Sequence, residues 1–317
     1  MARPPGAART QTGAAALSGP AQAAEWPPFR GFAPIASCHW QGIANILARH
    51  GMPDALRRVA PSWGIRWPGG GTLYGGGGWQ PMLRALFGAT VHVHTAPTLD
   101  ETEKIEQWAS DSGRPFVAEV DAWYLPSPYQ DTEHVVHTVV VMSRTPEGAV
   151  VADTMNNPRP TLIRRARYQQ MRGHPCAGRL EPYKLYIPEP GPYRDLPASE
   201  IADAVRGEVA RQAARSLSDL AAFIGWHARV GEPVDICRVA GERHQAAMLF
   251  DMLAGGAAGW ALAGAARMAE LRDDWYMVHM LTAHERAHET RQRLRAGRLL
   301  RQLLADEADF ARTVGGP

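Results

Sequence analysis

Cysteine is scarce in this sequence, and the few cysteines that occur are far apart. The chain contains three, Cys38, Cys176 and Cys237, and no two of them form a CxxC motif. An odd number at such wide spacing argues against a disulfide framework, and the missing motif argues against a structural zinc site built on thiolates. This usage of cysteine is typical of a reducing compartment, so we expect a cytoplasmic protein.

Strong net charge and long apolar runs are lacking as well. The formal net charge of the 317 residues is +2, so we expect neither nucleic acid nor a membrane as a partner. The basic start, MARPPGAAR, is not followed by the apolar core of a secretory signal, and we expect residues 1–26 to form a disordered tail. Residues 246–266 are apolar but contain Asp251 and four glycines, and we interpret them as one or two buried helices.

The residues that are present have the balance of a soluble globular protein, with 45% apolar and 21% charged residues. The pattern changes near residue 187, from short Val- and Ile-rich runs between Gly, Pro and Asn loops to long segments of helical periodicity. The join, IPEPGPYRDLP, holds four prolines and is typical of a linker. We therefore predict a catalytic domain over residues 27–187, a Pro-rich linker over 188–197 and an all-α domain over 198–317.

The first domain is predicted to be α+β, with helices first and an antiparallel sheet later. A helix should begin at Cys38 after Ser37 as its N-cap, and the last two strands should pair through the turn SRTPEG. The expected helices cover residues 38–50, 53–59, 80–87 and 99–110, and the expected strands cover residues 90–94, 116–120, 135–142 and 149–153.

Cys38 is placed by this pattern in the first turn of a helix. The unpaired backbone N–H groups and the positive end of the helix dipole stabilise a thiolate there, and the thiolate is the form that attacks a carbonyl. Position alone favours a small buried residue, which is the commonest fate of a free cysteine.

Two further residues, His137 and Asp153, support the interpretation of Cys38 as a nucleophile. His137 leads the apolar run HTVVVM, and Asp153 ends the next strand, where hairpin pairing should bring it beside His137. A carboxylate that accepts from the imidazole fixes its tautomer and stabilises the imidazolium. Taken singly, His137 could be a core histidine and Asp153 a turn residue. The order Cys, His, Asp together indicates a papain-like set that performs cysteine-dependent acyl transfer.

The residues around this set resemble a known family. The run DAWYLPSPYQDTEHVVHTVVV (residues 121–141) and the opening SCHWQGIANIL (residues 37–47) are similar to the N-terminal domain of the butirosin biosynthesis protein H-type family of papain-like cysteine acyltransferases. The Gly-rich middle and the turn DTMNNP fit the same layout, so the resemblance covers about residues 32–188.

The resemblance implies a papain-like fold and an acyltransferase of natural-product (antibiotic) biosynthesis that needs no cofactor. Such an enzyme takes an acyl group from the phosphopantetheine thioester of an acyl-carrier protein, holds it on a cysteine and passes it to a small-molecule amine as an amide, or to a hydroxyl as an ester. By this resemblance Cys38 is the nucleophile, His137 the base and Asp153 the orienter. The Gln that papain-like proteases often carry before the cysteine is missing here. Further candidates for substrate binding or the oxyanion hole are Gln41, Asp121, Tyr124, Tyr129 and His134.

Other interpretations stay open at this point. Water as the acceptor would make the same triad a thioesterase, amidase or peptidase, and a degenerate domain could bind an acyl carrier or a peptide without turnover. A zinc hydrolase is the other enzyme class, because His284, Glu285 and His288 match H-E-x-x-H, with Glu307 as a possible third ligand. The many arginines around this motif favour a solvated helix with Glu–Arg pairs instead.

Two weaker signals lie outside the triad. The segment GGGTLYGGGGW (residues 69–79) lacks the Lys-Ser/Thr of a P-loop, and it is either a loop that borders the site with Tyr74 or Trp79 or a plain connection. A basic run could receive an acidic carrier protein, although such runs are more often solvated. The run consists of Arg164, Arg165, Arg167, Arg172 and Arg179.

Overall fold

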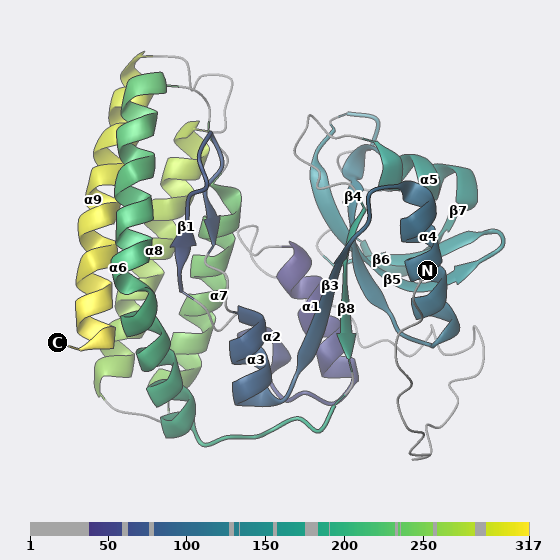
Figure 1. The fold of residues 1–317 in the computed structure, drawn as a ribbon, viewed down its shortest axis with the longest axis horizontal. Helices are drawn as coiled ribbons and strands as arrows, with labels where there is room; N and C mark the ends of the chain where they lie inside the picture. The colour runs from purple at the N-terminus through teal and green to yellow at the C-terminus, as the bar shows by residue number, and fades with distance from the viewer. Residues whose placement is uncertain are drawn as a thin grey trace, which may run out of the picture.

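The computed structural model places a β-sheet with its flanking helices beside a group of long helices (Figure 1). Between the two lie α1 (Cys38–Arg49), α2 (Ala55–Arg58) and α3 (Trp79–Phe87). The expected tail over residues 1–26 lies outside the described residues. The structure describes residues 38–58, 63–75, 79–126, 130–132, 134–154, 157–174, 183–189, 191–231, 234, 236–255, 259–282 and 290–316.

The main sheet of the described residues has six antiparallel strands in the order β3-β8-β4-β5-β6-β7. The Val-rich runs of the sequence form its centre, where Val117 pairs with Val140 and Val141 with Val151. A mixed α and β architecture with an antiparallel sheet is therefore confirmed. The strands are β3 (Thr90–Thr95), β4 (Phe116–Asp121), β5 (Val136–Thr145), β6 (Gly148–Asp153), β7 (Asn157–Arg164) and β8 (Lys184–Glu189).

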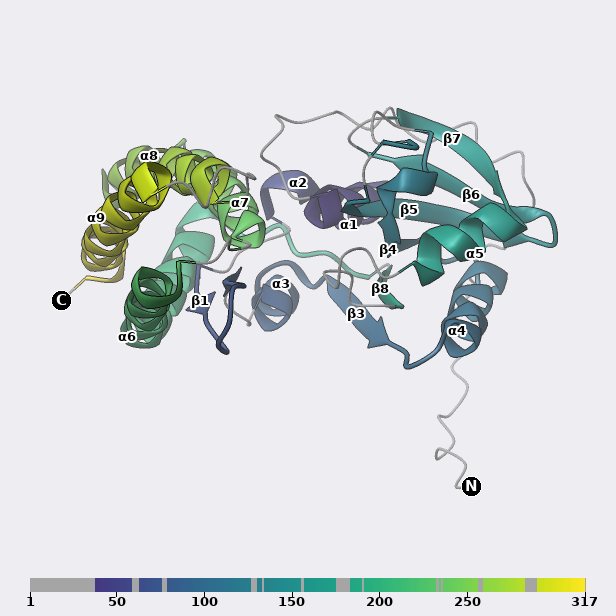
Figure 2. The ribbon, with the colours of Figure 1, turned by 90° about the horizontal axis from the view of Figure 1, so that it is seen from above.

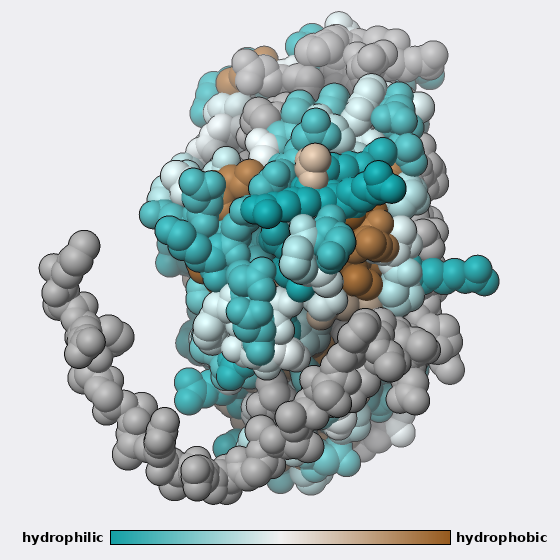
Figure 3. Space-filling model, turned by 90° about the vertical axis from the view of Figure 1, so that its right-hand side faces the viewer, coloured by the Kyte–Doolittle hydropathy of each residue, from teal (hydrophilic) through white to brown (hydrophobic). Residues whose placement is uncertain are grey.

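Helices cover both faces of this sheet (Figure 2). On one face, α1 (Cys38–Arg49) shares an apolar cluster with Val117 and Val140, and it approaches these two side chains at Gly42. On the other face, α4 (Leu99–Asp111) and α5 (Arg165–Gly173) lie over a second cluster that includes Val139 and Met171. The strands alternate between these two clusters, as buried strands with a side-chain period of two must. Figure 3 shows the molecule from the right-hand side of Figure 1, where the sheet lies, and this surface is mostly hydrophilic with a few apolar patches.

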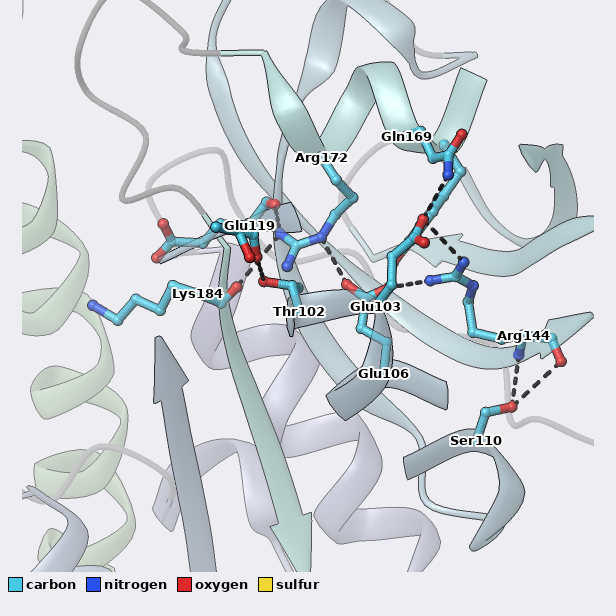
Figure 4. Close-up of polar contacts among 11 residues, drawn as sticks. Thr102, Glu103, Glu106, Ser110, Glu119, Arg144, Gln169, Arg172 and Lys184 are labelled. Atoms are coloured by element: carbon cyan, nitrogen blue, oxygen red, sulfur yellow. Dashed lines mark hydrogen bonds and ion pairs between the residues drawn. The ribbon is translucent and has the colours of Figure 1, made fainter. Parts of the chain in front are cut away.

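A buried ionic network joins α4 and α5 to the sheet (Figure 4). The Arg172 guanidinium is fully buried and donates from Nε to Glu106 Oε1 at 2.8 Å and from Nη1 to the main-chain oxygen of Glu119. Glu106 also accepts from Arg144 and, at 3.0 Å, from the Tyr168 hydroxyl. Burial by itself lowers the pKa of Arg172, but Glu106 outweighs this effect and raises it. The sequence predicted Arg172 on a solvated or carrier-binding face. This prediction is wrong, because the Arg172 guanidinium is buried and neutralises the buried Glu106 carboxylate.

The C-terminal half forms long helices around a core of Trp275, Leu300 and Phe310. The buried Glu307 carboxylate lies in this core and accepts from the side chains of Trp63, Arg243 and Trp275 at 2.7–2.8 Å. It is therefore not available as the third zinc ligand considered above. Trp63 comes from the N-terminal half, so both halves contribute to one apolar core. The helices are α6 (Ala198–Val230), α7 (Cys237–Ala254), α8 (Gly259–Thr282) and α9 (Thr290–Gly315).

Several elements differ from the sequence expectations. Residues 188–189 belong to β8, although four prolines indicated a linker there. Pro188 is tolerated because β4 pairs with β8 only at Leu185 and Tyr186, so that side of the strand is unpaired at the proline. Three short elements were not expected: β1 (Ile65–Arg66) and β2 (Tyr74–Gly75) pair around the Gly-rich region, and a 3₁₀ turn, η2 (Ala122–Tyr124), follows β4. Two helices differ in extent, because α2 (Ala55–Arg58) is shorter than expected and α3 (Trp79–Phe87) begins at the tryptophan.

The apolar residues 246–266 are divided between α7, which ends at Ala254, and α8, which begins at Gly259. Within the described residues, no helix combines the length and the hydropathy that crossing a membrane requires.

Close packing of α1 on the sheet predicts the effect of one substitution. A Cβ atom on Gly42 would lie 2.8 Å from Val117 Cγ2 and 3.2 Å from its Cγ1. Gly42→Ala should therefore push the helix away from the sheet, at a cost of about 1–3 kcal/mol that exceeds the ~1 kcal/mol gained in helix propensity. We expect a lower urea midpoint, measured by circular dichroism.

Gly207 in α6 provides the matched control. A Cβ atom there has no neighbour within 4 Å, so Gly207→Ala should raise the free energy of unfolding by about 0.5–1 kcal/mol. Equal shifts for the two variants would contradict the packing described for α1.

Candidate active site

Cys38 is the first residue of α1 and is half-buried. The helix is fixed behind it by buried apolar side chains, among them Ile43 and Trp40. Trp40 meets Trp79 edge to face, with ring centroids 4.6 Å apart, so the end of the Gly-rich segment supports the start of this helix. The thiol therefore lies at the positive end of a well-packed helix, as the sequence predicted. The expected N-cap, Ser37, lies outside the described residues.

His137 and Asp153 are brought together by the hairpin of β5 and β6. His137 is the second residue of β5, opposite Val120 of β4, and Asp153 is the last residue of β6. His137 Nε2 lies 2.8 Å from Asp153 Oδ1, and each side chain is only 6% exposed. Because Nε2 interacts with the carboxylate, Nδ1 is the ring nitrogen that remains for the thiol.

The charges of Cys38 and His137 support each other. Burial raises the pKa of the Cys38 thiol, but the His137 imidazolium and contacts with Thr138 outweigh burial, and the resulting pKa lies below its ordinary value. Burial likewise lowers the pKa of His137, but the Cys38 thiolate and the hydrogen bond to Asp153 raise it to about 10. Both shifts favour a thiolate–imidazolium pair, which is the reactive form of a nucleophilic cysteine.

His134, the other histidine near β5, has different partners. Its Nδ1 lies 2.6 Å from Asp121 Oδ2, and its ring stacks on Trp123 at a centroid distance of 4.4 Å. The Asp121 carboxylate is fully buried and also lies 2.8 Å from His174 Nδ1. The Tyr124 ring is near the same histidines, with its centroid 6.3 Å from that of His134. The candidates Asp121, Tyr124 and His134 thus form a second polar group on the β4–β5 connection.

Gln41 is completely buried in α1. Neither its amide oxygen nor its amide nitrogen makes a hydrogen bond to a described residue. Its side chain is therefore not exposed to a substrate in this arrangement. The remaining candidate of this kind, Tyr129, lies outside the described residues.

The structure does not test the H-E-x-x-H zinc pattern. His284, Glu285 and His288 lie outside the described residues. On β3, His92 Nε2 lies 3.2 Å from a carboxylate oxygen of Glu189, and the centroids of the His92 and His94 rings are 6.3 Å apart.

Two residues of these polar groups were not anticipated from the sequence. Thr138 lowers the pKa of Cys38 through its side chain and backbone, and its position directly after His137 on a strand was the available signal. His174 follows the end of α5 and reaches Asp121 only because α5 folds back on β4. No local pattern connects residues 121 and 174.

Comparisons with known proteins add little to what the geometry of the site shows. No protein-family model matches the chain, and no curated protein matches it. Among solved structures, the chain is similar to a protein described as a putative C39-like peptidase from Bacillus anthracis. The identity is 14% and the TM-score 0.31, over 50% of this chain and 89% of the other.

The thiolate–imidazolium pair predicts how alkylation of Cys38 depends on pH. In wild-type protein the pH midpoint of the reaction with iodoacetamide should lie below the pKa of an ordinary cysteine, which is about 8.5. In His137→Ala the imidazolium is lost and burial remains, so the pKa of Cys38 should rise and the rate at pH 7 should fall about tenfold for each unit of that rise. Peptide mass spectrometry can follow Cys38 separately from Cys176 and Cys237.

His134→Ala is the comparison that decides between the two histidines. Because its ring interacts with Asp121, its loss should leave the pH midpoint of Cys38 alkylation near that of the wild type. A shift in His134→Ala with none in His137→Ala would show that the base is assigned wrongly.

Proposed function

We propose that this protein is a cysteine-dependent acyltransferase with a papain-like catalytic arrangement. Cys38 is the nucleophile, His137 the general acid and base, and Asp153 the residue that orients the imidazole. The observation that supports this proposal is the connected set itself: a thiol at a helix start, a buried imidazole next to it and a carboxylate 2.8 Å from the far ring nitrogen.

The first step forms an acyl-enzyme. The Cys38 thiolate attacks the carbonyl carbon of a thioester, and the carbon–sulfur bond to the carrier breaks. The leaving thiolate takes the proton of the His137 imidazolium and departs as a thiol. The main-chain N–H of Cys38, at the start of α1, can stabilise the oxyanion that forms on the way.

The second step transfers the acyl group. An amine attacks the thioester carbon of the acylated Cys38, and His137, now neutral, accepts the amine's proton. The carbon–sulfur bond breaks, and the product amide leaves the thiolate–imidazolium pair restored. Asp153 holds the imidazole in place through both proton transfers.

The donor and acceptor follow from the resemblance of residues 37–47 and 121–141 to the butirosin biosynthesis protein H-type family. On this basis the donor is an acyl group on the phosphopantetheine of an acyl-carrier protein, and the acceptor is the amine of a small molecule in natural-product biosynthesis. Hydrolysis is the second candidate, because the same triad with water in place of the amine acts as a thioesterase or peptidase.

Intact-mass spectrometry with an acyl-S-pantetheine thioester tests the proposal. Wild-type protein should gain the mass of one acyl group, and hydroxylamine, which cleaves thioesters, should remove it. The gain should be absent in Cys38→Ser and retained in a Cys176→Ser, Cys237→Ser double variant. His137→Ala should acylate more slowly by roughly 10²–10⁴-fold, the usual contribution of general acid–base catalysis.

Adding amines to the acylated protein then separates transfer from hydrolysis. Loss of the adduct to amide indicates an acyltransferase, and loss to free acid with every amine tested indicates a hydrolase. If the wild type gains no acyl mass from thioesters but cleaves peptides, the acyltransferase proposal is wrong and the peptidase remains.

A further inference from the structure

A second group of potential ligands lies at the end of β4, apart from the triad. Asp121 Oδ2 is 2.6 Å from His134 Nδ1 and 2.8 Å from His174 Nδ1, and one ligand atom from each of the three residues lies within 4.8 Å of the others. Two imidazoles and one carboxylate are a common ligand set for zinc, which often has three protein ligands and one water. We propose that Asp121, His134 and His174 bind a Zn²⁺ ion, and this proposal is independent of the function of Cys38.

The three side chains are already oriented by their surroundings. Asp121 Oδ1 accepts from the backbone N–H of Trp123 at 3.0 Å, which leaves Oδ2 directed to the histidines. The Trp123 ring stacks on His134, and the His134 ring stacks on His174 at a centroid distance of 4.2 Å. Such outer contacts fix the orientation of ligands and contribute to metal affinity.

The buried ionic network sets the position of His174. Arg172, two residues before it, donates to the main-chain oxygen of Glu119, two residues before Asp121, and to Glu106 of α4 (Figure 4). The end of α5 is therefore attached to the end of β4 by a fully buried guanidinium. The ligand atoms of residues 121 and 174 are held together by this attachment and not only by their own interaction.

Hydrogen bonds do not satisfy every polar atom of Asp121, His134 and His174. Both imidazoles approach the same carboxylate oxygen, and the buried Nδ1 of His174 lacks hydrogen-bond geometry to any described residue despite its 2.8 Å approach. A buried ring nitrogen without a partner is unfavourable. Tetrahedral Zn²⁺ with bonds of about 2.0–2.1 Å separates its ligand atoms by about 3.3 Å, so small rotations of the side chains would admit the ion.

The fourth zinc position faces solvent in this arrangement. Asp121 is fully buried, but the side chains of His134 and His174 are 36% and 35% exposed. Zinc at this place would join His134, two residues before the start of β5, to His174 at the end of α5. It would thereby stabilise the strand that carries His137.

Zinc titration of the full chain, purified without a histidine tag, tests this site. Isothermal calorimetry should show one Zn²⁺ per chain, and Zn²⁺ should raise the melting temperature because it binds only the folded state. His174→Ala should weaken binding by more than the roughly 10–100-fold that loss of an outer-shell partner costs, and should abolish the shift in melting temperature. His134→Gln serves the same purpose if His174→Ala does not fold.

Two control variants separate this site from the others in the chain. Binding should persist in Cys38→Ser and in the double variant His284→Ala, His288→Ala. Loss of binding in either control would place the ion at the triad or at the H-E-x-x-H motif and overturn the proposal. So would the absence of stoichiometric binding to the wild type, or unchanged affinity in both His174→Ala and His134→Gln.

Discussion

The interaction on which the site depends is the placement of one buried imidazole between a thiolate and a carboxylate. His137 is 5% exposed, and burial alone would favour its neutral form and that of the Cys38 thiol. The two charges become stable together because each lies against the other, and the Asp153 carboxylate holds the positive one in place. Neither the thiolate nor the imidazolium would persist in this environment without its partner.

The rest of the fold keeps these groups in register. The close approach of Gly42 to Val117 sets α1 against the sheet, so the thiol at its first residue reaches the start of β5. On the opposite face, the buried pair of Glu106 and Arg172 attaches α4 and α5 to β4. Buried ion pairs add little net stability, but breaking one leaves an uncompensated charge, so the pair fixes the arrangement of its elements. The sheet is thus held from both sides where the reactive residues lie.

Local pattern was sufficient for part of this structure. The expected N-cap at Ser37 predicted the helix that begins at Cys38, and the turn SRTPEG predicted the hairpin that joins His137 to Asp153. β8 was missed because its central position depends on pairing with residues about 70–100 positions earlier. The role of Arg172 was misread for a similar reason, since its partner Glu106 is distant in sequence. His174 near Asp121 is likewise a product of tertiary folding.

The charge state of the His137 ring shows whether Cys38 and His137 form an ion pair. Nitrogen-15 NMR of the imidazole ring, assigned with His137→Gln, reports whether both ring nitrogens carry protons. We expect a doubly protonated His137 ring at pH 7, with a pKa of about 10, and a much lower pKa of His137 in Cys38→Ser, where the thiolate charge is absent. A neutral His137 ring at pH 7 in the wild type would contradict the thiolate–imidazolium pair and the nucleophile that depends on it.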